Sequence, residues 1–384
     1  MPRNSKRSER MKFHHFIPTE IFFGEKALDE DGEIVGILGK RAFIITGRSS
    51  SKNGSLNDVL NLLNRMKIEH DVSHDMEENP SFSLVVRITD KVKRFKPDFL
   101  IGIGGGSVLD SMKAVAVLSV NDIDPIDLYD QGRYSKALPM VAIPTTAGTG
   151  SEVTEYSVLT NDETRMKGGF KSNLIFPRYS FLDPRYTLTM SMELTIATGL
   201  DALSHSVESI LSTRSSEMSE IFALRANELI FQNLPKVLKN PDDLECRSKM
   251  LFASMLAGMA IAQTGTTIIH ALGYPLSTFK NLKHGLANSV LMIPTLRRIE
   301  KSHPNRVAKA ITPMKDVDDF EIFLKDMLSN LNLRMNLKRE EMEEWARIGS
   351  KAKHLKSTPG DFGYEEILNI YEEMMKEYGE GDKR

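Results

Sequence analysis

Four side chains in the second half of the chain have the types and spacing of a metal site. Asp201 and His205 stand four residues apart in the helix-like stretch GLDALSHSVES, so a carboxylate and an imidazole face the same side of one helix. His270 and His284 lie in the stretch IIHALGYPLSTFKNLKHG, residues 268–285. One oxygen and three nitrogen ligands suit Fe²⁺ or Zn²⁺ and not Ca²⁺ or Mg²⁺. An ion held in this way keeps a positive charge, so it could act as a Lewis acid on a bound alcohol.

Each of these residues also has an ordinary structural interpretation. An isolated Asp-x-x-x-His pair is most often a hydrogen bond on a helix surface, and a single histidine is most often a satisfied core or cap residue. On this alternative the protein would be a non-catalytic binding or assembly protein. That alternative has to explain four candidate ligands together with the two loops described next.

A glycine-rich turn in the first half of the chain has the composition of a diphosphate-binding loop. The stretch FLIGIGGGSVLD, residues 99–110, runs from an apolar strand into a helix. Backbone without Cβ atoms, together with free N–H groups at a helix N-terminus, can approach a diphosphate closely. The spacing G-x-G-x-x-S is not the full dinucleotide fingerprint, so a tight turn without a ligand is the alternative. The candidate binding residues are Gly104, Gly105, Gly106 and Ser107.

A hydroxyl-rich loop, IPTTAGTGSEVT at residues 143–154, follows the next predicted strand. Its side chains could donate hydrogen bonds to the ribose and carboxamide groups of a cofactor, although an ordinary turn has the same composition. Two such loops at the carboxyl ends of neighbouring strands favour a dinucleotide crevice over coincidence. The candidate residues are Thr145, Thr146, Thr149 and Thr154.

The elements that must position these residues change character near the middle of the chain. From about residue 41 to 183, short β-branched runs alternate with amphipathic stretches, a pattern typical of a parallel sheet covered by helices. After residue 190, apolar residues recur at helical spacing only. We therefore expect an α/β dinucleotide-binding domain over residues 1–187 and an all-helical metal-binding and catalytic domain over residues 188–384. Asp183-Pro184 marks a plausible boundary, because the residue before a proline disfavours helix.

Composition excludes several classes of partner. Lys and Arg number 50 against 52 Asp and Glu, and this balance offers no general attraction to nucleic acid or an anionic membrane. The single cysteine, Cys246, cannot form an intrachain disulfide and fits a reducing compartment. The basic N-terminus, MPRNSKRSER, lacks a signal core, and no segment approaches the ~18 apolar residues of a membrane span. We expect a cytoplasmic enzyme with a small-molecule substrate.

Four segments, in the order IGIGGGSVLD, PTTAGTGSE, GLDALSHSVE and HALGYPLSTFKNLKHGLAN, resemble the iron-containing (group III) alcohol dehydrogenase family. The resemblance implies a dehydroquinate synthase-like fold with a divalent metal in the cleft between an α/β domain and an all-helical domain. It also implies a homo-oligomer, a dimer or higher. The metal ligands and catalytic residues that it implies are Asp201, His205, His270 and His284.

The same resemblance assigns cofactor contacts. Residues 104–107 would hold the cofactor diphosphate, and Thr145, Thr146, Thr154 and Lys167 would lie along its ribose and nicotinamide half. Asn79, in the stretch ENP, matches another cofactor-contacting position. Without the motif context, Lys167 would be interpreted as a solvated loop lysine.

The chain departs from the family at one position near the metal. Many members carry a further, non-ligating histidine four residues after the third ligand, where this chain has Tyr274. The proton path is therefore left open, with a tyrosine hydroxyl or a water chain as alternatives. His354, in the polar segment KAKHLKSTPG, is expected to lie in the substrate pocket, although an exposed surface histidine is the alternative.

The resemblance predicts reversible oxidation of an alcohol to an aldehyde or ketone, with hydride transfer to NAD or NADP. In NAD-preferring enzymes of this kind an aspartate follows the first clear strand and repels a 2′-phosphate. This chain has Gly47 there, followed by Arg48, Ser49 and Ser50, which could hold a phosphate, so NADP is predicted to be preferred. A solvated turn is the alternative. A polyol or polyol-phosphate dehydrogenase and a dehydroquinate synthase-like lyase are same-fold alternatives for the reaction.

Overall fold

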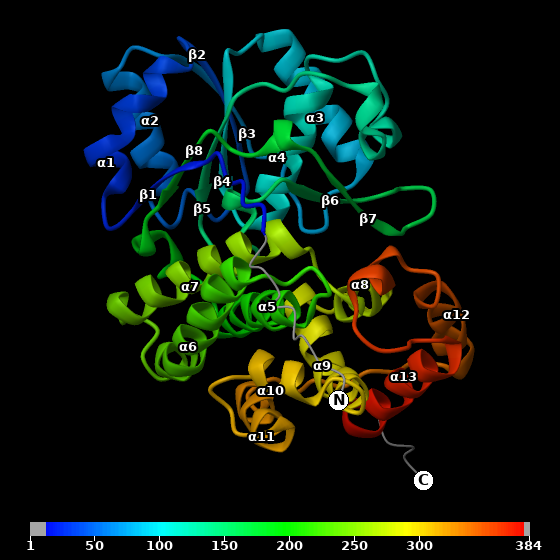
Figure 1. The fold of residues 1–384 in the computed structure, drawn as a ribbon. Coiled ribbons are helices and arrows are strands. Elements are labelled where there is room, and N and C mark those ends of the chain that lie inside the picture. Colours follow the sequence, from blue (N-terminus) through cyan, green and yellow to red (C-terminus); the bar gives the residue numbers. More distant parts are fainter. Residues whose placement is uncertain (1–12, 380–384) are drawn as a thin grey trace, which may run out of the picture.

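The structure, a computed structural model, describes residues 13–379 and divides into a sheet-containing half and a helical half. Figure 1 shows the sheet and its covering helices in the upper half and the remaining helices below. The basic N-terminal decapeptide lies outside the described residues. The predicted fold class, an α/β domain followed by an all-helical domain, is confirmed.

A six-stranded parallel sheet forms the core of the first half, in the order β1-β8-β5-β4-β2-β3. Sequence patterns had indicated the central strands, whereas β1, β3 and β8 were not identified, since strands of four or five residues carry little pattern. The strands are β1 (Glu20–Phe23), β2 (Arg41–Thr46), β3 (Glu69–Ser73), β4 (Phe99–Gly104), β5 (Met140–Pro144) and β8 (Tyr179–Leu182).

Helices cover both faces of this sheet, and for this reason its central strands are largely apolar. In β2, Phe43 and Ile45 pack against α3 and α4, whereas Ala42 and Ile44 face α1 and α2. Figure 1 shows these two pairs of helices on opposite sides of the sheet. The helices are α1 (Ala27–Asp31), α2 (Ser55–Arg65), α3 (Phe82–Phe95) and α4 (Gly106–Leu118).

An antiparallel hairpin, β6 (Tyr156–Thr160) and β7 (Lys167–Lys171), extends from the first half beside the helical half. The sequence interpretation did not identify it. Its strands are only half buried, with Phe170 and Leu159 inside and their neighbours partly exposed, so the apolar signal is weak. The hairpin carries Lys167, which becomes important below.

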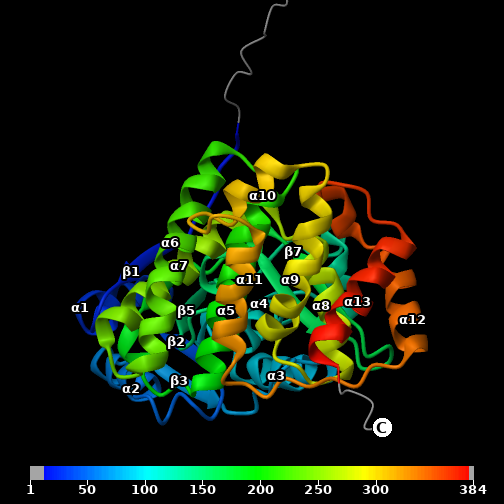
Figure 2. The ribbon, with the colours of Figure 1, turned by 90° about the horizontal axis from the view of Figure 1, so that it is seen from below.

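The second half consists of helices arranged around α5, which is buried along most of its length and packs against α6, α7 and α9. Ser191 caps this helix by accepting a hydrogen bond from the Leu194 N–H. Figure 2, seen from below, shows α6 and α7 at one side of this half and α12 and α13 at the other. The helices are α5 (Met192–Leu211), α6 (Glu217–Lys239), α7 (Leu244–Thr264), α8 (Ile268–Phe279), α9 (His284–Glu300), α10 (Pro304–Ala310), α11 (Val317–Leu328), α12 (Arg339–Gly349) and α13 (Tyr364–Tyr378).

The two halves meet closely. Strand β8 ends at Leu182 and α5 begins at Met192, and we propose that the domain boundary falls in this connection, at residues 187 and 188. A Cβ atom on Gly150 would lie 2.5 Å from the Gly258 Cα atom of α7, so this contact requires glycine on both sides.

Within residues 13–379, no single helix is long and apolar enough to cross a membrane. Helices α7 and α8 are long and apolar enough only when taken together, and the chain bends by 115° between them.

Candidate active site

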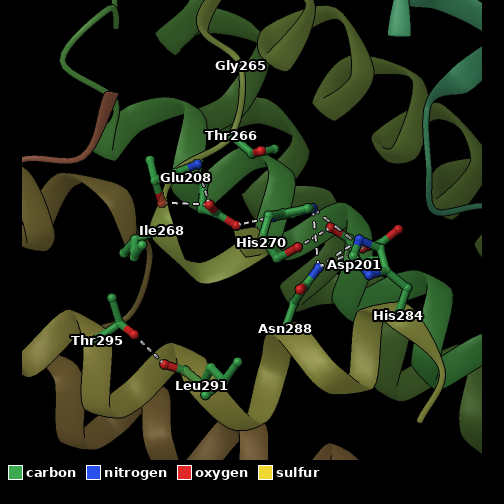
Figure 3. A network of polar contacts seen from close by, with 12 residues as sticks. Asp201, Glu208, Gly265, Thr266, Ile268, His270, His284, Asn288, Leu291 and Thr295 are labelled. Carbon is green, nitrogen blue, oxygen red and sulfur yellow. Dashed lines mark hydrogen bonds and ion pairs between the residues drawn. The ribbon is translucent and has the colours of Figure 1, made fainter. Parts of the chain in front are cut away.

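Three of the four predicted ligands form a compact cluster. The ligand atoms of Asp201, His270 and His284 all lie within 4.8 Å of one another. The Asp201 Oδ1 atom is 4.0 Å from His270 Nε2 and 3.9 Å from His284 Nε2, distances too long for a hydrogen bond. In a tetrahedral site, two ligand atoms that each lie ~2.0–2.2 Å from the ion stand about 3.4 Å apart, so the two observed distances exceed that spacing by about half an ångström. Figure 3 shows the three side chains turned toward one another.

Close packing between helices produces this convergence. Asp201 lies on α5, His270 on the first turn of α8, and His284 is the first residue of α9. A Cβ atom on Gly285 would lie only 1.8 Å from the Ala197 carbonyl oxygen of α5, so glycine is required at that position. Because Gly285 lets the start of α9 touch α5, the neighbouring imidazole reaches the Asp201 carboxylate.

His205 lies beside this cluster and not among its three closely spaced ligand atoms. Its ring stacks on that of His270, with centroids 4.8 Å apart and planes inclined by 22°. Its Nδ1 atom is buried and has no hydrogen-bond partner among residues 13–379, and the same holds for His284 Nδ1. Burying such an atom without a partner is unfavourable. A fourth-ligand role for His205 stays a prediction.

The donor set fits a transition-metal ion. Burial lowers the pKa values of His205 and His284, so both rings are neutral near neutral pH and keep lone pairs for a cation. Imidazole nitrogens with one carboxylate oxygen are the ligands that Fe²⁺ and Zn²⁺ accept. The residues present could therefore hold such an ion.

Glu208 anchors His270 from behind the cluster. One carboxylate oxygen of this fully buried residue pairs with His270 Nδ1, and the other accepts hydrogen bonds from the Thr267 N–H at 2.5 Å and hydroxyl at 2.6 Å. Although burial opposes it, the Glu208 carboxylate raises the pKa of His270 and therefore stabilises positive charge on this ring. With Nδ1 held in this way, Nε2 faces the cluster, as in carboxylate–histidine–metal arrangements.

Asn288 closes the cluster from α9. Its Nδ2 atom lies 3.2 Å from Asp201 Oδ1, 3.2 Å from His270 Nε2 and 3.3 Å from His284 Nε2. Figure 3 shows this amide between the three predicted ligands. Sequence analysis missed both Glu208 and Asn288. Helical spacing could have indicated them, because Asn288 follows His284 by four residues and Glu208 follows Asp201 by seven.

A cavity of about 490 Å³ joins the cluster to the predicted cofactor loops. It lies between the two halves of the chain. Of the predicted cofactor residues, those that line the cavity are Asn79, Gly106, Ser107, Thr149, Thr154 and Lys167. Those that do not line it are Gly47, Arg48, Ser49, Ser50, Gly104, Gly105, Thr145 and Thr146.

The two predicted cofactor loops pack directly against each other. A Cβ atom on Gly106 would lie 2.6 Å from the Thr149 side chain, and one on Gly105 would lie 3.0 Å from the Thr146 hydroxyl. The glycines are therefore needed for loop packing, whether or not a diphosphate approaches them. Beneath the loops, the buried Lys113 donates hydrogen bonds to the Ser151 hydroxyl at 2.8 Å and the Tyr156 carbonyl at 2.7 Å.

The turn after β2 reaches the same edge of the sheet as the glycine loop, since Thr46 is the register partner of Ile103 in β4. Arg48 and Ser49 are exposed there. The Ser50 side chain is fully buried, and its hydroxyl is bonded to Thr46 Oγ1 at 2.6 Å and to the Gly47 carbonyl at 3.0 Å. Its hydroxyl is therefore already engaged, and Arg48 and Ser49 remain the better candidates to contact a phosphate.

Aromatic side chains line the cavity beyond the metal cluster. The Tyr274 ring stacks on His284 with centroids 5.6 Å apart and meets the His354 ring edge-on at 6.2 Å. His354 lines the cavity and is half buried, which agrees with the pocket interpretation and not with an exposed histidine. Burial lowers its pKa to about 4, and it lowers that of Lys167 to about 8. The imidazoles of His205, His284 and His354 are therefore neutral near neutral pH, and the cavity also contains one partly desolvated lysine.

Comparisons with known proteins agree with this architecture. Residues 18–184 match the family described as iron-containing alcohol dehydrogenase, and residues 195–375 match the C-terminal domain of that family. Alcohol dehydrogenase 4 of Saccharomyces cerevisiae is 34% identical over 72% of this chain and 73% of its own length. A sulfoacetaldehyde reductase of Bilophila wadsworthia is 30% identical over 94% of this chain and 99% of its own length. The crystal structure of an iron-containing alcohol dehydrogenase from Thermotoga maritima superposes with a TM-score of 0.88, at 46% identity, over 95% of this chain and all of that one.

Proposed function

This chain belongs to the iron-containing alcohol dehydrogenase family and is an oxidoreductase of that family, and from this premise we propose that it interconverts an alcohol and its aldehyde or ketone with NADP as the preferred cofactor. One observation carries the proposal: a single cavity connects the cluster of Asp201, His270 and His284 with the glycine-rich and hydroxyl-rich loops. A substrate in this cavity would therefore lie between a metal and a nicotinamide.

When bound, a divalent ion, Fe²⁺ or Zn²⁺, supplies Lewis acidity and the nicotinamide accepts or donates hydride. We propose that Asp201, His205, His270 and His284 would hold the ion. The loops at residues 104–107 and 145–154, with Asn79 and Lys167, would hold the cofactor. The geometry observed for residues 106, 107 and 149 at the cavity wall supports this assignment.

The chain's own groups orient the reactants and exclude water. Glu208 fixes the imidazole of His270 so that Nε2 faces the cavity, and Asp201 adds negative charge at the opposite side of the cluster. Lys167 lies at the cavity wall, where burial lowers its pKa and the negative charge of Asp201 partly opposes that effect. Tyr274 packs over His284 and covers it. Holding substrate and cofactor together in this enclosed space lowers the entropic cost of hydride transfer.

NADP preference is supported by the turn after β2. A Cβ atom on Gly47 would meet only the Met76 carbonyl oxygen, at 3.9 Å, so the space for an acidic side chain exists but is not used. Arg48 is exposed beside it and has no carboxylate within 4.0 Å among the described residues. A guanidinium next to an open turn suits a 2′-phosphate.

The direct experiment measures alcohol oxidation by the metal-loaded protein with each nicotinamide cofactor, following absorbance of the reduced nicotinamide. His284→Ala is the control, because it removes one ligand. We expect this variant to lose metal and activity while cofactor affinity stays within about tenfold, or ~1.4 kcal/mol. A His284→Ala protein that retains stoichiometric metal and near-normal turnover would contradict the assignment. A lyase of the same fold would regenerate its cofactor and show no net absorbance change.

A further inference from the structure

We infer that the substrate of this site is a short alcohol or aldehyde that carries a terminal oxyanion, such as a carboxylate, sulfonate or phosphate, held by Arg214 and Lys353. The inference rests on the proposed function and adds the chemical class of its substrate. The inference depends on positively charged side chains that line one wall of the cavity, and the sequence alone did not indicate that they lie together. The lysines nearest to the metal motifs in sequence, Lys280 and Lys283, lie near Glu341 and Glu78 instead.

Besides Lys167, three cations from distant parts of the chain line the cavity: Lys171 of β7, Arg214 after α5, and Lys353 after α12. No carboxylate oxygen among residues 13–379 lies within 4.0 Å of any of them. Lys171 interacts with the buried Glu155 over a longer distance, so the uncompensated charge rests chiefly on Arg214 and Lys353. All three residues are exposed to solvent.

The two carboxylates of the cavity wall are already engaged. Asp201 belongs to the metal cluster, and Asp110 accepts hydrogen bonds from the Ser151 hydroxyl at 2.6 Å and the Val158 N–H at 2.9 Å. Neither is therefore free to neutralise the cations at the mouth. An incoming anion is the group that would balance them.

Backbone and hydroxyl contacts hold the cationic wall in place. The Thr213 N–H donates to the Ser357 carbonyl oxygen at 2.9 Å, and the Ser357 hydroxyl donates to the Thr266 carbonyl oxygen at 2.9 Å. These bonds join the segment that carries Arg214, the segment that carries Lys353 and the turn before α8. The cations consequently have a defined place relative to His270, which lies in the first turn of α8.

Arg214 and Tyr156 come together beside Gly265. A Cβ atom on Gly265 would lie 3.7 Å from an Arg214 guanidinium nitrogen and 3.7 Å from the Tyr156 hydroxyl oxygen, and both side chains line the cavity. The Tyr156 hydroxyl is paired with the Glu155 carboxylate, so the fork-shaped guanidinium of Arg214 is the donor offered to an oxyanion.

The test compares alcohols that differ in charge and not in size. The metal-loaded enzyme is assayed with ω-hydroxyalkanoates of increasing chain length and with the corresponding ω-hydroxyamides, and then with hydroxyalkyl sulfonates and phosphates. We expect the best anionic substrate to exceed its neutral amide in kcat/KM by at least about tenfold, the size of one charged hydrogen bond. Comparison of the three anions identifies the oxyanion.

Arg214→Gln and Lys353→Gln should each reduce that preference by about tenfold, mainly through KM, and Arg214→Lys should retain part of it. KM for the cofactor should not change, which separates substrate binding from cofactor phosphate binding. Lys356→Gln is the matched control, because this exposed lysine lies on the same short helix as Lys353 and does not line the cavity.

Oxidation of neutral alcohols at the same efficiency as anionic ones, with no effect of Arg214→Gln, would overturn the inference and leave the proposed function intact. Absence of turnover with every alcohol would instead contradict the proposed function. In that case calorimetric titration of the cofactor complex with the hydroxyalkanoates decides the inference separately. Binding lost in Arg214→Gln supports it, and no binding by the wild type overturns it.

Discussion

Replacing Glu208 with glutamine should weaken metal binding by about 10- to 100-fold without unfolding the helical half of the protein. In the wild type both carboxylate oxygens act as acceptors, one toward His270 Nδ1 and the other toward the Thr267 N–H and hydroxyl. Glutamine has the same shape but offers one acceptor and one donor group. It cannot satisfy both neighbours in the way that the carboxylate does.

The glutamine amide has two orientations, and each has a cost. If its oxygen faces Thr267, its NH₂ group faces His270 Nδ1, which must then accept, so the proton moves to Nε2 and blocks the lone pair turned toward the metal. If its oxygen faces His270, the buried Thr267 N–H loses its acceptor, at a cost of ~1–3 kcal/mol. The first orientation predicts a loss of metal affinity, and a 10- to 100-fold loss corresponds to ~1.4–2.7 kcal/mol.

The assay is a competition titration of Co²⁺ or Zn²⁺ against a chromophoric chelator, with the visible spectrum of the Co²⁺ protein as a second readout of ligand geometry. Ser209→Ala is the matched control, because this buried hydroxyl lies next to Glu208 on α5 but contacts Thr264. We expect the control to bind metal normally. Unchanged affinity and an unchanged Co²⁺ spectrum in Glu208→Gln would refute the view that this carboxylate orients His270.

Three further predictions concern other parts of the molecule. Gly285→Ala should push α9 away from α5, because its Cβ would lie 1.8 Å from the Ala197 carbonyl oxygen. We expect the free energy of unfolding, measured by chemical denaturation, to fall by ~1–3 kcal/mol, and metal affinity to fall as well. Gly47→Asp should lower the ratio of kcat/KM with NADP to kcat/KM with NAD, because the new carboxylate repels the 2′-phosphate by ~1–3 kcal/mol. An unchanged ratio would show that this turn does not bind the 2′-phosphate. Burial raises the pKa of Glu152 to about 7 from the 4.5 of an exposed group, so the folded state binds the extra proton and this residue's contribution to stability is present below pH 4.5 and lost as pH rises through about 7. In Glu152→Gln this pH-dependent loss of stability, at most ~3 kcal/mol, should be absent. Thermal melts compare the two proteins between about pH 5 and 7.5, and the assignment would be contradicted if the stability of the variant relative to the wild type did not increase over this range.

Much of the fold followed from local pattern. The buried strands β2, β4 and β5 read as apolar runs because helices cover both sheet faces, and the second half shows helical periodicity because each helix buries one face. The hairpin β6-β7 was not identified, since its strands are half exposed and gain their order from the cavity wall and from Tyr129, whose hydroxyl donates to the Gly168 carbonyl at 2.9 Å. Local sequence patterns do not indicate a contact between residues 39 positions apart.

The sequence by itself determined which residues could bind a metal, because ligand chemistry resides in side-chain type and i,i+4 spacing is fixed by helix geometry. Only the tertiary structure decided how those ligands meet: it brings Asp201, His270 and His284 together through the contact at Gly285 and leaves His205 stacked at the side. The fold likewise decided which cations line the cavity together, and it is on these that we infer a charged substrate. Arg214 and Lys353 are separated by 139 positions in sequence. They share one wall because hydrogen bonds join their segments, and no local rule relates residues so far apart.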